Sequence, residues 1–111
     1  MKVTTRQENH VSIVDISGEM DSSALEALMI VNKLTTNSNS CIIINLEKAT
    51  FIDSTGLGSL LQIYKQLRHR KIPFYVVSAQ GAVKKVFDVT KMEKMLPYSS
   101  SLDEALLYLN N

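Results

Sequence analysis

The sequence predicts an α/β domain in which helices flank a mixed, mostly parallel sheet, and three observations lead to this prediction. Two β-branched stretches, residues 2–7 and 11–16, are separated by a Glu8-Asn9 turn and predict a hairpin. Beyond them, apolar stretches of strand length alternate with amphipathic stretches of helix length. Right-handed crossovers between such units produce parallel strands. The expected order is β-β-α-β-α-β-α-β-α, with about five strands and about four helices.

The first half of the chain contributes one helix and the central strand. Residues 18–21 (Gly-Glu-Met-Asp) are expected to end the second strand, with Asp21 or Ser22 capping a helix over residues 24–34. Residues 35–40 are polar turn formers and predict a loop. Residues 41–45 are apolar at successive positions, which predicts a central strand buried on both faces. The helix expected over residues 24–34 has its apolar positions at Leu25, Leu28, Met29, Ile30 and Val31.

The second half alternates helices and strands. A helix is expected from about residue 54 to residue 70, followed by a strand over 74–77 and a helix over 81–89. Residues 96–98 predict a short edge strand because Pro97 cannot donate to a ladder. Ser101 and Glu104 form a capping-box pattern before the last helix. The helix expected from about residue 54 to residue 70 has a predicted core stripe of Leu57, Leu60, Leu61, Tyr64 and Leu67.

Composition limits the possible functions. A length of 111 residues predicts a single domain, residues 1–111, and a net charge of +1 argues against a nucleic-acid partner. No apolar stretch approaches the roughly 20 residues that span a bilayer, so no membrane partner is expected. The single cysteine, Cys41, starts an apolar strand and is expected to be a buried, inert thiol. Because no secretory leader pattern follows Met1, we expect a cytoplasmic protein.

The segment Phe51–Gly58 is the expected site of function. It joins the central strand to the next helix, and Ser54 is expected to be exposed at that turn. A phosphate on Ser54 would meet the unpaired N–H groups and positive potential of a helix N-terminus. The same residues, Asp-Ser-Thr-Gly, also describe an ordinary helix cap. From the residues alone, both interpretations stay open.

Enzyme and cofactor signatures are missing from the sequence. It contains no GxSxG, P-loop, GxGxxG, CxxC or HExxH pattern, so no catalytic residue, cofactor or metal is predicted. A nucleophilic serine would need a base, and nothing in the sequence places His10 or His69 beside Ser54. The expected activity is binding.

The segment Phe-Ile-Asp-Ser-Thr-Gly-Leu-Gly at residues 51–58 closely resembles the signature of the STAS-domain family of bacterial anti-sigma factor antagonists. Residues 18–21 resemble a second family motif, Gly-Glu-hydrophobic-Asp. Residues 82–88 resemble the third-helix segment, and residues 104–106 also fit. The likeness spans almost the whole chain, with the motifs in the family's order.

This resemblance implies a phosphorylation-controlled binding module with a STAS-like fold. In such a system the unphosphorylated protein binds an anti-sigma factor that is also a serine kinase, which releases a sigma factor. The kinase phosphorylates the first serine after the aspartate, here Ser54, and a serine phosphatase reverses the modification. Asp21 and Asp53 match the family's acidic positions, and Thr55 adds a second hydroxyl.

The predicted partner surface combines the turn, the start of the helix and the loop at residues 18–21. Two other functions remain open. One is a scaffold or partner-switching subunit whose output is not a sigma factor. The other is a small-ligand or nucleotide-binding module that uses the same helix N-terminus. The residues predicted to contact a partner are Asp21, Asp53, Ser54, Thr55, Gly56, Leu57, Gly58, Ser59 and Gln62.

Overall fold

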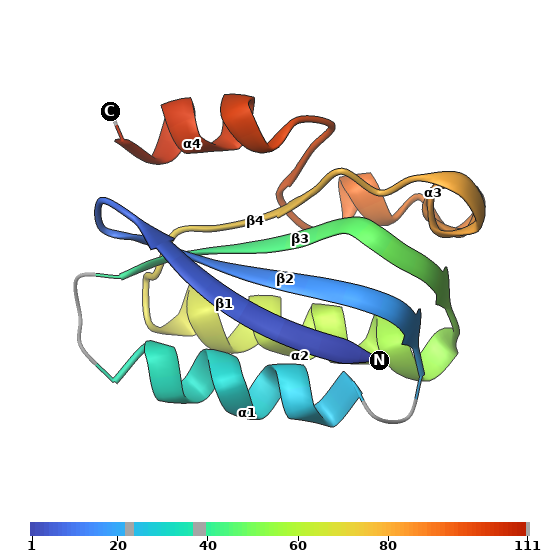
Figure 1. The fold of residues 1–111 in the computed structure, drawn as a ribbon, viewed down its shortest axis with the longest axis horizontal. Helices are drawn as coiled ribbons and strands as arrows, with labels where there is room; N and C mark the ends of the chain where they lie inside the picture. The colour runs from blue at the N-terminus through green and yellow to red at the C-terminus, as the bar shows by residue number, and fades with distance from the viewer. Residues whose placement is uncertain (22–23, 37–39, 111) are drawn as a thin grey trace.

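The structure, a computed structural model, describes residues 1–21, 24–36 and 40–110. Its five-stranded sheet has the order β1-β2-β3-β4-β5. The first two strands are antiparallel, and every other neighbouring pair is parallel. Helices lie on both faces of the sheet (Figure 1). The predicted fold class and element order are therefore confirmed.

The elements follow the expected sequence closely. The strands are β1 (Lys2–Glu8), β2 (Val11–Met20), β3 (Cys41–Ile52), β4 (Phe74–Val77) and β5 (Tyr98–Ser99). The helices are α1 (Leu25–Leu34), α2 (Ser54–His69), α3 (Gly81–Thr90) and α4 (Leu102–Asn110). A short 3-10 helix, η2 (Met92–Lys94), was not predicted. It begins after Lys91, whose φ of 56° ends α3 in the left-handed conformation.

Two strand ends differ from the prediction. Residues 18–20 were expected to break β2, but the strand continues to Met20. Gly18, with φ of 85°, lies at an irregularity in the pairing between β2 and β3, which lets the ladder resume. β3 is likewise longer than predicted and ends at Ile52, which pairs with Met20. Each strand extends because the other supplies its hydrogen-bond partner.

The core has one part on each face of the sheet. The larger part includes side chains of α1, α2 and α3, such as Leu28, Leu60 and Phe87. The smaller part lies under α4 and includes Ile13, Cys41 and Ile43. Figure 1 shows α4 on the opposite side of the sheet from α1 and α2. Burial raises the pKa of the Cys41 thiol, in keeping with the inert role predicted for it.

One side of α1 packs on the sheet. Of the apolar positions in its sequence, Leu28 and Val31 are buried, whereas Leu25 and Met29 are 58% and 66% exposed. The helix instead buries Ala27 against the sheet. Asp21 is not its N-cap: Ala24 precedes the helix, and the Asp21 carbonyl accepts a hydrogen bond from the Ala24 N–H at 2.9 Å. The alternative cap, Ser22, lies outside the described residues.

The α2 stripe is centred differently from the predicted one. Leu60, Ile63 and Leu67 are fully buried, whereas three of the predicted positions are half-buried margins of the core. Those margins are Leu57, Leu61 and Tyr64. The sequence pattern missed Ile63 because apolar side chains surround more than one face of this helix.

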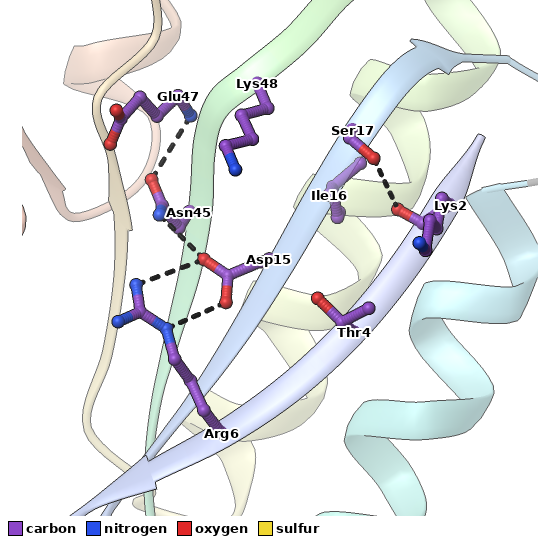
Figure 2. Close-up of a pocket in the computed structure, with 9 residues that line it drawn as sticks. All are labelled: Lys2, Thr4, Arg6, Asp15, Ile16, Ser17, Asn45, Glu47 and Lys48. Carbon is purple, nitrogen blue, oxygen red and sulfur yellow. Dashed lines mark hydrogen bonds and ion pairs between the residues drawn. The ribbon is translucent and has the colours of Figure 1, made fainter.

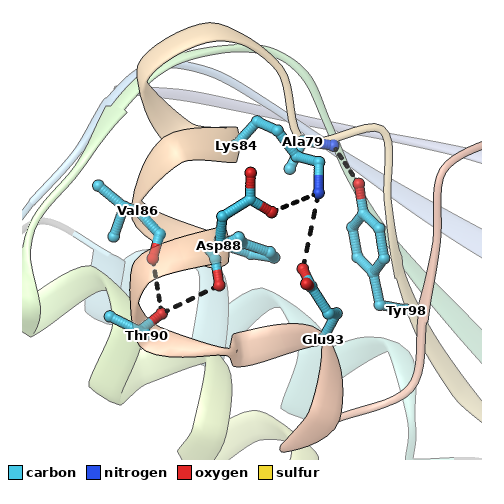
Figure 3. Close-up of polar contacts among 8 residues, drawn as sticks. Ala79, Lys84, Val86, Asp88, Thr90, Glu93 and Tyr98 are labelled. Carbon is cyan, nitrogen blue, oxygen red and sulfur yellow. Dashed lines mark hydrogen bonds and ion pairs between the residues drawn. The ribbon is translucent and has the colours of Figure 1, made fainter.

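Polar contacts fix α3 and the last strand. Lys84 Nζ lies 2.6 Å from Asp88 Oδ1 and 3.7 Å from Glu93 Oε2, which links α3 to η2 (Figure 3). The Ala79 N–H donates to the Tyr98 hydroxyl at 3.1 Å. β5 begins at Tyr98 and not at residue 96, because the Leu96 N–H donates to the Met92 carbonyl at 3.2 Å and not to the sheet. At α4, half of the predicted capping box forms: the Ser101 hydroxyl accepts from the Glu104 N–H, but the Glu104 carboxylate accepts from the Tyr108 hydroxyl and not from the Ser101 N–H.

Candidate functional site

The site begins where β3 ends and α2 starts. Asp53 is extended, with φ of −105° and ψ of −175°, and its Oδ1 accepts a hydrogen bond from the Gly56 N–H at 2.9 Å. Its backbone carbonyl accepts from the Leu57 N–H at 2.9 Å. Asp53 therefore satisfies one of the free donors of the first turn and fixes the direction in which α2 leaves the sheet.

Ser54 is the first residue of α2 and is exposed. Within the part of the chain that the structure describes, its hydroxyl makes no hydrogen bond, and neither does that of Thr55. The N–H groups of both residues belong to the first helical turn, where no intrahelical acceptor exists. The exposed Ser54 hydroxyl therefore stands beside unpaired donors and the positive end of the helix dipole.

The two predicted turns are neighbours in space, and Gly56 explains how. Gly56 is buried, and a Cβ at this position would lie 2.3 Å from the Met20 carbonyl oxygen and 2.8 Å from Ile52 Cγ1. The Asp53 N–H also donates a hydrogen bond to the Met20 carbonyl at 3.3 Å. The first turn of α2 is thus packed against the end of β2, which places Asp21, the next residue, at the same edge.

The remaining predicted residues divide by exposure. Gly58 and Gln62 are exposed and follow Ser54 at intervals of four residues, so the three positions share one face of α2. A Cβ on Gly58 would meet nothing within 4 Å, so the surface beside Ser54 is low there. Leu57 and Ser59 are half-buried, and the Ser59 hydroxyl donates to the Thr55 carbonyl at 3.1 Å. Gly56 itself does not contribute to the surface.

Sequence reasoning missed three exposed apolar side chains at this end of the molecule. Phe51, three residues before Ser54, is 44% exposed. Leu25 and Met29 are exposed on α1, which packs beside α2 and begins at the same end of the sheet (Figure 1). A signal was available, because Leu25 and Met29 are four residues apart and therefore share a helix face. Apolar residues on the other faces of the same helix obscured it.

Neither histidine can serve Ser54 as a base. His69 ends α2, which puts it 15 residues from Ser54, or roughly 22 Å along the helix axis. His10 lies at the β1–β2 turn, at the far end of β2 from Met20, and its Nε2 is 3.1 Å from the Leu109 carbonyl. Within the described residues, no group of three or more possible metal ligands occurs.

None of the described helices combines the length and apolar character that crossing a bilayer requires.

Comparison with known proteins identifies the family. The model of the STAS domain family matches residues 2–105. The chain belongs to the STAS domain family. The anti-sigma-B factor antagonist of Staphylococcus aureus is 22% identical over 97 residues, which cover 86% of this chain and 90% of that relative.

Solved structures of anti-sigma factor antagonists are similar to this one over nearly the whole chain. An anti-sigma factor antagonist from Mycobacterium paratuberculosis gives a TM-score of 0.86 at 26% identity, covering 99% of this chain and 94% of that one. The unphosphorylated form of the anti-sigma factor antagonist SpoIIAA gives a TM-score of 0.72 at 19% identity, with 99% of both chains covered. At 19% identity, the likeness to SpoIIAA shows that the two proteins share a fold and shows nothing about their functions.

Proposed function

We propose that residues 1–111 act as one STAS domain that works as an anti-sigma factor antagonist in the cytoplasm. In this proposal the unphosphorylated protein binds an anti-sigma factor that is also a serine kinase, and phosphorylation of Ser54 abolishes the complex. A serine phosphatase restores binding. The chain contributes a binding surface, and the kinase contributes the catalytic groups.

One observation carries the proposal: the Ser54 hydroxyl is exposed and makes no hydrogen bond to the residues that the structure describes. A kinase can therefore reach it without unfolding α2. Gly58, one turn further along, leaves open space beside the hydroxyl for an approaching protein. The family membership and the names of the similar proteins support the same function.

The apolar side chains near the turn supply the contact area that a partner needs. Phe51 lies three residues before Ser54, and Leu25 and Met29 lie on α1, which packs beside α2. All three side chains are large and exposed. Aromatic residues and methionine are enriched in protein interfaces, where burial of their surface drives association. We infer that the anti-sigma factor covers these side chains together with Ser54, Gly58 and Gln62.

Electrostatic repulsion and desolvation explain how phosphorylation of Ser54 would abolish the complex. A phosphoserine carries roughly −1.5 to −2 charges at neutral pH. A negative charge of the partner about 5 Å from the phosphate, at an effective dielectric constant near 20, would be repelled by roughly 3 kcal/mol per unit of charge on the phosphate. That repulsion corresponds to about a hundredfold loss of affinity. Because the partner would also have to desolvate the dianion, one phosphate suffices to separate the two proteins.

Phosphorylation mapping tests the proposal. The protein is incubated with ATP and, one at a time, with the anti-sigma factors encoded in the same genome, and the modified residue is identified by mass spectrometry. We expect a mass increase of about 80 Da on Ser54 with one of these kinases. Thr55→Ala should remain a substrate, whereas Ser54→Ala should not. Modification at Thr55 alone, or none with any kinase, contradicts the proposal.

A further inference from the structure

The sheet face that carries α4 is only partly covered. Under α4, β2 and β3 present apolar side chains, including Ile13 and Ile43. Two residues further along each strand, on the same face, the side chains are Asp15 and Asn45. These polar residues line a cavity of about 440 Å³ whose other side is formed by β1 (Figure 2). We call this cavity the α4-face pocket.

A connected set of hydrogen bonds fixes one end of the pocket. Arg6 Nε donates to Asp15 Oδ2 at 2.9 Å, and Asn45 Nδ2 donates to Asp15 Oδ1 at 2.8 Å. Asn45 is 6% exposed, and its Oδ1 accepts from the Glu47 N–H at 3.2 Å. The bond to Asp15 is the main cause of the raised pKa of Arg6. This end is therefore held in place by hydrogen bonds, and the charges of Arg6 and Asp15 compensate each other, while the Glu47 carboxylate adds a negative charge that acts on Arg6.

The other end of the pocket carries uncompensated positive charge. Ser17 pairs with Lys2 on one side and with Lys48 on the other, so the three residues form one row across β1, β2 and β3. Neither lysine ammonium makes an ion pair or hydrogen bond with any residue in the described ranges. The carboxylate of Glu47 points away from Lys48 in Figure 2.

The row has a spacing that suits an anion. Strands lie about 4.8 Å apart, so the Cα atoms of Lys2 and Lys48 are roughly 10 Å from each other, with Ser17 between them. Two flexible ammonium groups can converge on one anionic group over Ser17 from opposite sides. The Ser17 hydroxyl reaches the Lys2 carbonyl only at 3.5 Å, a long contact that a better acceptor would replace.

We propose that the α4-face pocket binds a small organic anion through a carboxylate or phosphate group held between Lys2 and Lys48 above Ser17. Arg6, Asp15 and Asn45 form the fixed wall against which the rest of the ligand lies. The volume falls within the range of small-ligand sites. The pocket lies on the opposite face of the sheet from α2, so this ligand and the partner of Ser54 occupy separate surfaces.

Titration of the isotope-labelled protein followed by NMR tests this site. Citrate represents the carboxylate source, and inorganic phosphate represents the phosphate source. We expect at least one of them to shift the amide signals of Lys2, Ser17 and Lys48 saturably, and the active probe identifies the chemical class. Lys2→Gln and Lys48→Gln should each weaken binding about tenfold or more, since each removes a charge-assisted contact.

Two controls separate this site from general surface charge and from the Ser54 surface. Lys85→Gln removes an exposed lysine of α3 and should leave the affinity unchanged. Ser54→Asp should also bind the anion normally, so failure here is distinguishable from failure of the proposed function. Equal affinity in wild type and Lys48→Gln, or no saturable shift with either probe, would overturn the proposal. Binding of a glutamate-rich peptide but of neither small anion would also overturn it, in favour of a protein partner.

Discussion

Gly56 and Gly58 stand two residues apart in α2 and have opposite roles. Gly56 is required by packing, because the Met20 carbonyl and the Ile52 side chain occupy the space that any Cβ would need. Gly58 faces open space in the described structure, so packing does not require it. Sequence reasoning placed both in the predicted partner surface. Only the tertiary structure separates them, because the close approach of β2 to α2 is a tertiary contact.

This difference predicts opposite effects of two alanine substitutions on stability. Gly56→Ala should lower the free energy of unfolding by about 1–3 kcal/mol or more, since a backbone carbonyl cannot move aside cheaply. Gly58→Ala should raise it by about 0.5–1 kcal/mol, because alanine is the better helix former at an open helical position. Urea denaturation of both variants checks this, and a loss of stability in Gly58→Ala would be inconsistent with open space there.

Helix ends account for much of how α1 and α2 are held. The first turn of α2 is fixed by Asp53, and the last turn of α1 is fixed by Arg70. Arg70 Nη1 donates to the buried Thr35 hydroxyl at 2.8 Å, and Nη2 donates to the Thr35 carbonyl. The Thr35 hydroxyl in turn donates to the Val31 carbonyl at 2.8 Å. The cation thus lies beside the carbonyl end of α1, where the helix dipole favours it.

Removal of the contact between Arg70 and Thr35 should destabilise the protein. Arg70→Ala should lower the free energy of unfolding by about 1–3 kcal/mol, because it leaves the buried Thr35 carbonyl without its side-chain donor. The matched control is Arg68→Ala, an exposed arginine two residues earlier, which should change stability by less than about 0.5 kcal/mol. Equal effects in the two variants, measured by urea denaturation, would mean that Arg70 does not link α2 to α1.

The start of α2 should tolerate a negative charge. Ser54→Asp places a carboxylate at the positive end of the helix dipole, which favours it by about 0.3–1 kcal/mol, less the repulsion from Asp53. We therefore expect its free energy of unfolding to stay within about 1 kcal/mol of wild type, whereas Ser54→Lys should be less stable than Ser54→Asp. A loss of several kcal/mol in Ser54→Asp, measured by thermal or urea unfolding, would show that Ser54 is needed for packing.

At the scale of the whole molecule, the sheet separates two surfaces. α1 and α2 cover one face, with Ser54 at its edge, and α4 covers part of the other face beside the α4-face pocket. The sequence predicted the order of elements because hydrophobic periodicity and turn residues are local signals. It could not predict the pocket, because Lys2, Ser17 and Lys48 come together only through strand register.

The candidate site was predicted only in part, because some of its features follow from local sequence signals and others depend on tertiary packing. Asp53 as a cap and Ser54 as an exposed residue follow from the local pattern of strand, Asp-Ser-Thr-Gly and helix. The exposure of Leu25 and Met29 does not, since it depends on which face of α1 meets the sheet.

In the proposed function, the phosphorylation state of one exposed hydroxyl, that of Ser54, decides whether the protein binds its partner. The most direct measurement is calorimetric titration of the anti-sigma factor with the unmodified protein and with protein phosphorylated at Ser54. We predict an affinity about a hundredfold lower for the phosphorylated form, with both forms equally folded by circular dichroism. Equal affinities of the two folded forms would contradict the account.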